Sequence, residues 1–83
     1  MERIIYNQLL EEGTVVYRPV LSTLIEENIY KVGGDDIYDA ENELWQFPPH
    51  TIVMVEEREF SDGLALVVIG EYKDPTKLNG SDL

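Results

Sequence analysis

The stretch from residue 45 to residue 53, Trp-Gln-Phe-Pro-Pro-His-Thr-Ile-Val, constrains the fold of this chain more than any other. Each proline ring fixes its own φ, and each proline biases the residue before it towards extended geometry. The chain therefore reaches Thr51 already extended, where an apolar run begins. We predict that residues 47–49 form a rigid corner that leads into a core strand.

The rest of the chain is typical of short β-strands, because segments rich in β-branched and aromatic residues alternate with turns. The expected strands cover residues 3–10, 14–21, 29–32, 51–60 and 64–69. The last two form a hairpin in which Gly63 is free to take a left-handed φ. We predict an all-β fold, a small SH3-like barrel of about five short antiparallel strands with one long acidic loop between strands three and four. Closure into a barrel removes the exposed edges of such strands.

Residues 20–27 admit a second interpretation. Their apolar residues also match a helical spacing: Val20, Leu21, Leu24 and Ile25. We interpret the segment as a strand. The alternative is a helix packed on an antiparallel sheet.

Two residues just before this segment limit how a strand is placed there. Pro19 cannot donate a ladder hydrogen bond, so it should lie at a sheet edge or at a bulge. Alternation puts Arg18 on the same face as Val16 and Val20. We therefore expect the Arg18 guanidinium at the rim of the barrel or against a carboxylate.

The length of 83 residues accommodates one domain, because a second core could not bury enough surface to offset the entropy of ordering it. We expect residues 1–72 to form this domain and residues 73–83 to form a flexible polar C-terminal tail. The chain has no cysteine, which excludes a disulfide framework and fits the cytosol. No apolar run approaches membrane-spanning length and the first residues do not begin a signal peptide, so we expect a cytoplasmic protein.

The charge balance indicates the class of partner. The chain carries 17 acidic and 6 basic residues, a net charge of −11. A field of this sign repels nucleic acid phosphates and anionic lipid headgroups, whereas it speeds encounters with basic proteins. We therefore expect no nucleic acid and no membrane, and a basic protein as the partner. The alternative is that the charge only keeps a small β protein soluble and its edges unpaired.

The acidic loop, residues 35–43, concentrates this charge. Ile37 and Tyr38 are its only large apolar anchors, and a helical turn is expected near Ala40. Trp45 follows the loop, and electrostatic complementarity favours a basic protein at this place. The candidate partner contacts are Asp35, Asp36, Asp39, Glu41, Glu43, Tyr38 and Trp45.

The aromatic residues admit two interpretations. A surface groove for extended or proline-rich peptides would be formed by Tyr17, Tyr30, Tyr38, Trp45 and Phe47. Alternatively, Trp45 and Phe47 plug one end of the barrel. We favour the plug for Phe47 and leave both interpretations open for Trp45.

Motifs for catalysis and cofactor binding are weak. His50 is the only imidazole, and its place after two prolines favours an ordinary surface histidine over the base of a nucleophilic triad. An EF-hand loop counted from Asp35 fails, because its third and sixth positions are Ile37 and Ala40. The pair at 33–34, Gly-Gly, lacks the pattern of a phosphate-binding loop. We predict no enzyme activity, no metal site and no cofactor.

Three motifs together resemble a family of small bacterial proteins. Residues 13–20 match its G-T-x-V-[WY]-R-P-V opening, residues 29–30 are Ile-Tyr, and residues 45–49 match its W-x-F-P-P corner. The resemblance extends over residues 13 to about 68. The family has no established activity, so the resemblance implies a fold rather than a function. The chain departs from the family pattern at His50, where glycine is expected.

Three functional hypotheses follow. The first is a non-enzymatic protein-binding module that engages a basic partner through the acidic loop and the aromatic corner, for example as an immunity-type inhibitor of a basic toxin nuclease. The second is a domain that binds a small ligand or uses clustered carboxylates for catalysis, which needs a pocket containing Arg18 and at least two carboxylates. The third is a structural domain or one that forms homo-oligomers.

Overall fold

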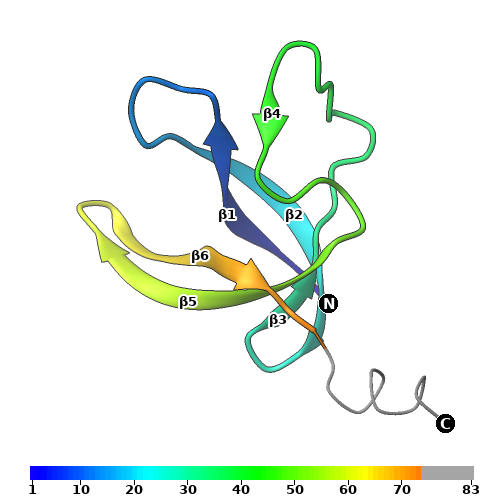
Figure 1. Ribbon diagram of the computed structural model, residues 1–83. Coiled ribbons are helices and arrows are strands. Elements are labelled where there is room, and N and C mark those ends of the chain that lie inside the picture. The colour runs from blue at the N-terminus through cyan, green and yellow to red at the C-terminus, as the bar shows by residue number, and fades with distance from the viewer. Residues whose placement is uncertain (74–83) are drawn as a thin grey trace, which may run out of the picture.

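The computed structural model describes residues 1–73 of the chain (Figure 1). These residues form six strands and no helix: β1 (Glu2–Leu10), β2 (Tyr17–Glu26), β3 (Ile29–Lys31), β4 (Leu44–Trp45), β5 (Ile52–Phe60) and β6 (Gly63–Glu71). The predicted all-β class is confirmed, and the segment that admitted a helix continues β2 as a strand. Most of the predicted C-terminal tail, residues 74–83, lies outside the described residues.

Five of the strands close into a ring (Figure 1). The pairing order is β2-β3-β5-β6-β1, β1 also pairs with β2, and the short β4 is added to the end of β1. All pairs are antiparallel except β1 with β6, which are parallel. The expectation of antiparallel strands throughout was wrong at this one pair. A closed ring with an odd number of strands cannot alternate in direction at every step, so one pair must be parallel. The finer prediction of an SH3-like barrel stays a prediction.

The turns that join β2 to β3 and β5 to β6 each contain or border a residue with a positive φ. Asn28, between β2 and β3, has a φ of +63°, and Gly63, the first residue of β6, has a φ of +126°. Glycine adopts such a conformation without strain, and asparagine does so more readily than most residues. The β5–β6 hairpin predicted around Gly63 is therefore confirmed.

Strand β2 shows the expected alternation of faces. Val20 and Ser22 are buried, whereas Leu21 is half exposed on the opposite face. Pro19 lies opposite Tyr6 of β1, in the half of β2 that β3 does not reach, because β3 pairs with β2 only from residue 23 onward. The missing N–H of Pro19 therefore faces a sheet edge, as predicted.

The core lies inside the ring. Its buried residues are Ile5, Leu9, Val20, Tyr30, Val32, Trp45, Val53, Val55, Leu66 and Val68, with Val16, Leu24, Tyr38 and Phe47 packed against them. Trp45 is only 2% exposed. Of the two interpretations of the aromatic corner, the structure therefore supports the plug for Trp45 and Phe47.

The proline corner is fastened to β1 by a buried asparagine. The Nδ2 of Asn7 donates to the Phe47 carbonyl at 2.6 Å, and the Phe47 amide donates to the Asn7 Oδ1 at 3.4 Å. On its other side the corner is held by the His50 amide, which donates to the Val32 carbonyl at 2.7 Å. His50 itself has a φ of +78°, in the left-handed region that favours glycine. The resemblance predicts glycine at this position, and glycine would adopt this φ without strain.

Candidate protein-binding face

Two hydrogen-bonded turns shape the acidic loop. In the first, the Gly34 carbonyl accepts hydrogen bonds from the amides of Ile37 at 3.0 Å and Tyr38 at 2.9 Å. In the second, the Asp39 carbonyl accepts from the amides of Asn42 at 3.0 Å and Glu43 at 2.9 Å. The second turn contains Ala40, where a helical turn was predicted. The loop is thus a folded segment whose own backbone bonds present its carboxylates.

Gly34 and Gly33 anchor the start of this loop. A Cβ on Gly34 would lie 2.8 Å from the Cη2 atom of Trp45, and its φ is +80°. Both facts require glycine at that position. The Gly33 amide donates to the buried Ser22 Oγ of β2 at 3.1 Å. The first acidic turn is therefore fixed against both the core and β2.

Asp39 has a mainly local role. One of its carboxylate oxygens accepts from the Glu41 amide at 3.0 Å, and the other accepts from the Asn42 Nδ2 at 2.7 Å. A carboxylate that bonds amides two and three residues further on stabilises a turn. Asp39 therefore holds the second turn in shape while it adds negative charge to the loop.

Glu43 and Trp45 do not offer a free binding surface. The Trp45 Nε1 donates to the Glu43 Oε1 at 2.8 Å, and the same oxygen lies 3.6 Å from the Arg18 Nε. The Tyr38 ring packs on the indole with a centroid distance of 4.7 Å. The prediction of Trp45 as a partner contact is therefore corrected, because its ring is enclosed by the core. The structure also identifies Glu43 as the carboxylate expected against Arg18.

A groove of about 650 Å³ opens where the first acidic turn meets the outer face of β2. We call it the loop groove. Its walls include three large aliphatic side chains that are exposed by about half: Leu21 (50%), Ile25 (50%) and Ile37 (49%). Aliphatic side chains gathered at one open groove are typical of a surface that binds another molecule.

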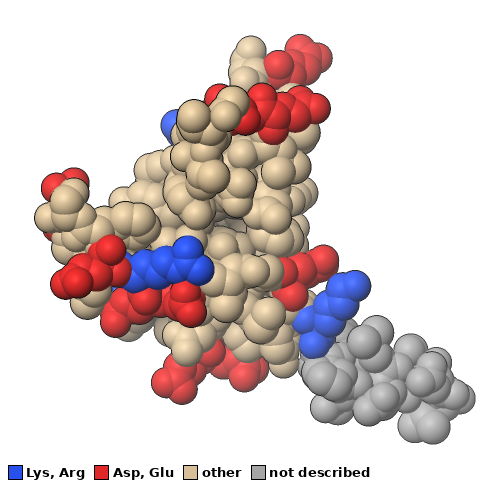
Figure 2. Space-filling model, turned by 60° about the vertical axis from the view of Figure 1, so that its left-hand side comes forward, with Lys and Arg blue, Asp and Glu red and all other residues tan. Residues whose placement is uncertain are grey.

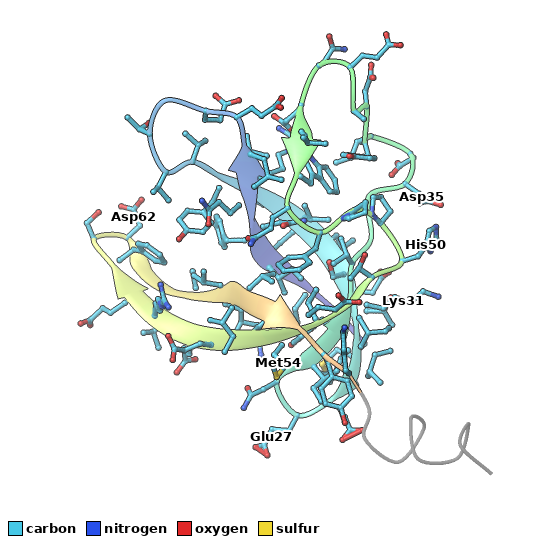
Figure 3. All side chains as sticks on the ribbon, in the orientation of Figure 1. Glu27, Lys31, Asp35, His50, Met54 and Asp62 are labelled. Atoms are coloured by element: carbon cyan, nitrogen blue, oxygen red, sulfur yellow. The ribbon has the colours of Figure 1, made fainter. Side chains whose placement is uncertain are left out.

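Charged side chains border the loop groove. Figure 3 shows Lys31, Asp35 and His50 on one side of the molecule, away from Asp62. The His50 Nε2 lies 3.5 Å from the Asp35 Oδ2, and both side chains are exposed. Three carboxylates line the groove, from Glu2, Asp35 and Asp36, against the single ammonium of Lys31.

The other carboxylates of the acidic loop belong to Asp35, Asp36, Asp39 and Glu41, of which Asp35 lies beside His50. Within residues 1–73, no Lys or Arg forms an ion pair with Asp35, Asp36, Asp39 or Glu41. Figure 2 shows acidic side chains projecting at the end of the molecule that carries this loop. The negative charge of the loop is therefore presented to solvent.

The predicted aromatic groove does not form as one surface. Tyr30 and Trp45 are buried, and Tyr38 and Phe47 pack against the core. Tyr17 lies elsewhere, in a cleft with Tyr6 and Phe60 that the sequence analysis did not identify. The available signal was alternation along β1, because Tyr6 lies between the buried residues 5 and 7 and must point outwards.

The surroundings of Arg18 give the second hypothesis no support. Arg18 contacts one carboxylate, Glu43, and lines none of the three cavities around β1, β2 and the β5–β6 hairpin. Among residues 1–73, no group of three or more His, Cys, Asp or Glu side chains is placed to hold a metal ion. The same part of the chain contains no helix of the length and apolarity needed to cross a membrane.

Comparisons with protein-family models, with curated proteins and with solved structures found no match. The resemblance to a bacterial family therefore stays a prediction. The geometry of the loop groove and the acidic loop is what supports a function for this chain.

Proposed function

We propose that the chain is a non-enzymatic protein-binding module that engages a basic partner through the acidic loop and the loop groove. One observation carries this proposal: carboxylates without a Lys or Arg partner in the described residues border a groove with three half-exposed aliphatic side chains. A partner surface that places lysines or arginines beside a few apolar side chains is complementary to it. Trp45 supports this surface from beneath.

The two kinds of contact contribute differently to binding. Completing the burial of three half-exposed aliphatic side chains supplies about 1 kcal/mol each. The carboxylates add mainly to the association rate and to the choice of partner, because exposed charges are screened by salt. The aliphatic side chains should therefore set the lifetime of the complex, and the carboxylates its dependence on ionic strength.

One form of this function is an immunity-type inhibitor, since an acidic surface of this kind is complementary to the basic surface of a nuclease. The assignment of the ring as an SH3-like barrel is part of the same proposal. Its closure supports that assignment, and the parallel pair of β1 and β6 is where it departs from the expected antiparallel arrangement.

The test is affinity capture on the immobilised chain from an extract of the source organism, followed by reconstitution with the purified captured protein. We expect a basic protein that is retained at low ionic strength and released as ionic strength rises. Asp35→Asn/Asp36→Asn should slow association of the purified pair, and Leu21→Ser/Ile37→Ser should speed its dissociation.

A matched control removes the same charge elsewhere. Glu11 and Glu12 are exposed and do not line the loop groove. Glu11→Gln/Glu12→Gln therefore removes as much negative charge as the Asp35→Asn/Asp36→Asn variant. It should leave most of the association rate unchanged. Equal effects of the two charge variants, or retention insensitive to salt, would contradict the proposal.

A further inference from the structure

A second cleft, which we call the aromatic cleft, lies between the β1–β2 hairpin and the β5–β6 hairpin. Figure 1 shows the tips of these hairpins on the same side of the molecule. The cleft has a volume of about 420 Å³ and is lined by Tyr6, Tyr17, Phe60, Leu64 and the turn between β5 and β6. It shares no lining residue with the loop groove.

The aromatic cleft opens because β1 and β6 pair over only a short length. The pairing covers only Ile5↔Leu66 and Tyr6↔Val67. Val67 is 1% exposed although it does not belong to the core cluster inside the ring. The outer faces of β1 and β6 are therefore covered at this junction, and the two hairpins diverge beyond it.

The rings of the aromatic cleft are held in place but remain accessible. The centroids of Tyr6 and Phe60 lie 6.5 Å apart, with an interplanar angle of 41°. Phe60 is 45% exposed and Leu64 is 65% exposed, at the end of the hairpin. Large apolar side chains kept this exposed in a concave site are typical of binding surfaces.

The lining of the aromatic cleft carries negative charge only, although Arg3 lines the neighbouring cavity beside Tyr6 and Leu64. Asp62 supplies the only charged side chain in the lining of the aromatic cleft, which contains no Lys and no Arg. Arg58 is the nearest cation of the hairpin, and its Nε donates to the Glu56 Oε2 at 2.7 Å. This hydrogen bond is the main cause that raises the pKa of the Arg58 guanidinium, so Arg58 stays charged and is paired with Glu56. Figure 2, with the side of the hairpin tips turned forward, shows uncharged surface together with acidic and basic side chains.

We propose that the aromatic cleft binds an arginine side chain of a partner protein, with the guanidinium against the rings of Tyr6, Tyr17 and Phe60 and paired with Asp62. The face of an aromatic ring attracts cations. A planar guanidinium also stacks on rings and bonds a carboxylate in a fork, which an ammonium cannot do. The proposal does not depend on the loop groove, because the two sites share no lining residue.

The test uses three short peptides that differ at one residue, acetyl-Gly-Xaa-Gly-amide with Xaa as arginine, lysine or citrulline. Citrulline has the shape of arginine without its charge. The chemical shifts of backbone amides and aromatic rings are followed during titration of the full chain. We expect the arginine peptide to shift the resonances of Tyr6, Phe60 and Gly63, with an affinity roughly threefold to fivefold above that of the citrulline peptide.

Two variants and a control locate the site. Phe60→Leu keeps the apolar bulk of an exposed side chain and removes the ring, and Asp62→Asn removes the charge; each should weaken binding of the arginine peptide roughly threefold. Asp35→Asn, in the loop groove, should leave it unchanged. Equal binding of the citrulline peptide, or shifts confined to the acidic loop, would overturn the proposal, and equal binding of the lysine peptide would overturn the assignment to arginine. The peptide titration uses the chain without the basic partner of the loop groove. Failure of the loop-groove proposal would therefore leave the result of this titration unchanged.

Discussion

The two aromatic regions of this molecule place rings beside a carboxylate, but among residues 1–73 only one of these carboxylates pairs with a Lys or Arg. At the Trp45 end of the ring, Glu43 accepts from the indole and lies against Arg18. In the aromatic cleft, Asp62 lies beside exposed rings and no Lys or Arg belongs to the lining. The difference suggests that an aromatic and acidic cluster becomes part of the core when the chain supplies its cation. In the aromatic cleft, where Asp62 has no such partner among residues 1–73, the ring of Phe60 stays 45% exposed.

The largest expected effect comes from removing one aromatic side chain from each region. Trp45→Ala should lower the free energy of unfolding by about 3–5 kcal/mol, because it leaves a large cavity in the core. Phe60→Ala should lower it by about 1 kcal/mol or less, because that ring is half exposed. Urea unfolding of both variants measures the contrast. Similar losses in the two variants would remove the structural distinction between the regions.

The next effect concerns Asn7, which ties the proline corner to β1. Asn7→Ala should lower the free energy of unfolding by about 1–3 kcal/mol, because the Phe47 carbonyl and amide lose their partner in a partly buried place. Asn7→Asp also removes the Nδ2 donor and places a buried carboxylate against the Phe47 carbonyl, so its loss should be at least as large. If Asn7→Ala were neutral in urea unfolding, the prolines and the His50 amide would hold the corner without Asn7.

The smallest effect is expected at His50, in the turn after the prolines. His50→Gly should raise the free energy of unfolding by about 0.5 kcal/mol, because relief of the positive φ outweighs the extra flexibility of glycine in the unfolded chain. His50→Ala removes the imidazole beside Asp35 and keeps the strained φ, so it should bring no gain. A thermal unfolding series of the two variants separates these causes. An equal gain from alanine would attribute the effect to the side chain.

Much of the fold could be predicted from local residue patterns. The strands follow from runs of β-branched residues, the β5–β6 hairpin from Gly63, and the alternation of β2 from the spacing of its apolar residues. The position of the parallel pair could not be predicted in this way, because it depends on which strands meet when the ring closes. Pattern alone gives no information on which distant strands meet.

The candidate sites were less accessible to sequence reasoning. The acidic loop could be predicted from its composition, but the loop groove depends on Leu21 and Ile25, which belong to β2. The environment of Trp45 depends on Gly34, whose missing side chain lets the indole pack against the chain. The contacts of the acidic loop with β2, and of Gly34 with Trp45, arise from tertiary packing. The local pattern of residues does not predict such contacts.

The central claim is that Trp45 belongs to the core while partners bind outside it, and the most direct measurement is quenching of Trp45 fluorescence by acrylamide with and without the captured basic partner. Trp45 is the only tryptophan of the chain, so its signal is unambiguous in the presence of a partner that lacks tryptophan or has it replaced. We predict weak quenching in the free protein and the same weak quenching in the complex. Strong quenching in the free protein that falls on binding would show that Trp45 is a partner contact and would contradict the account.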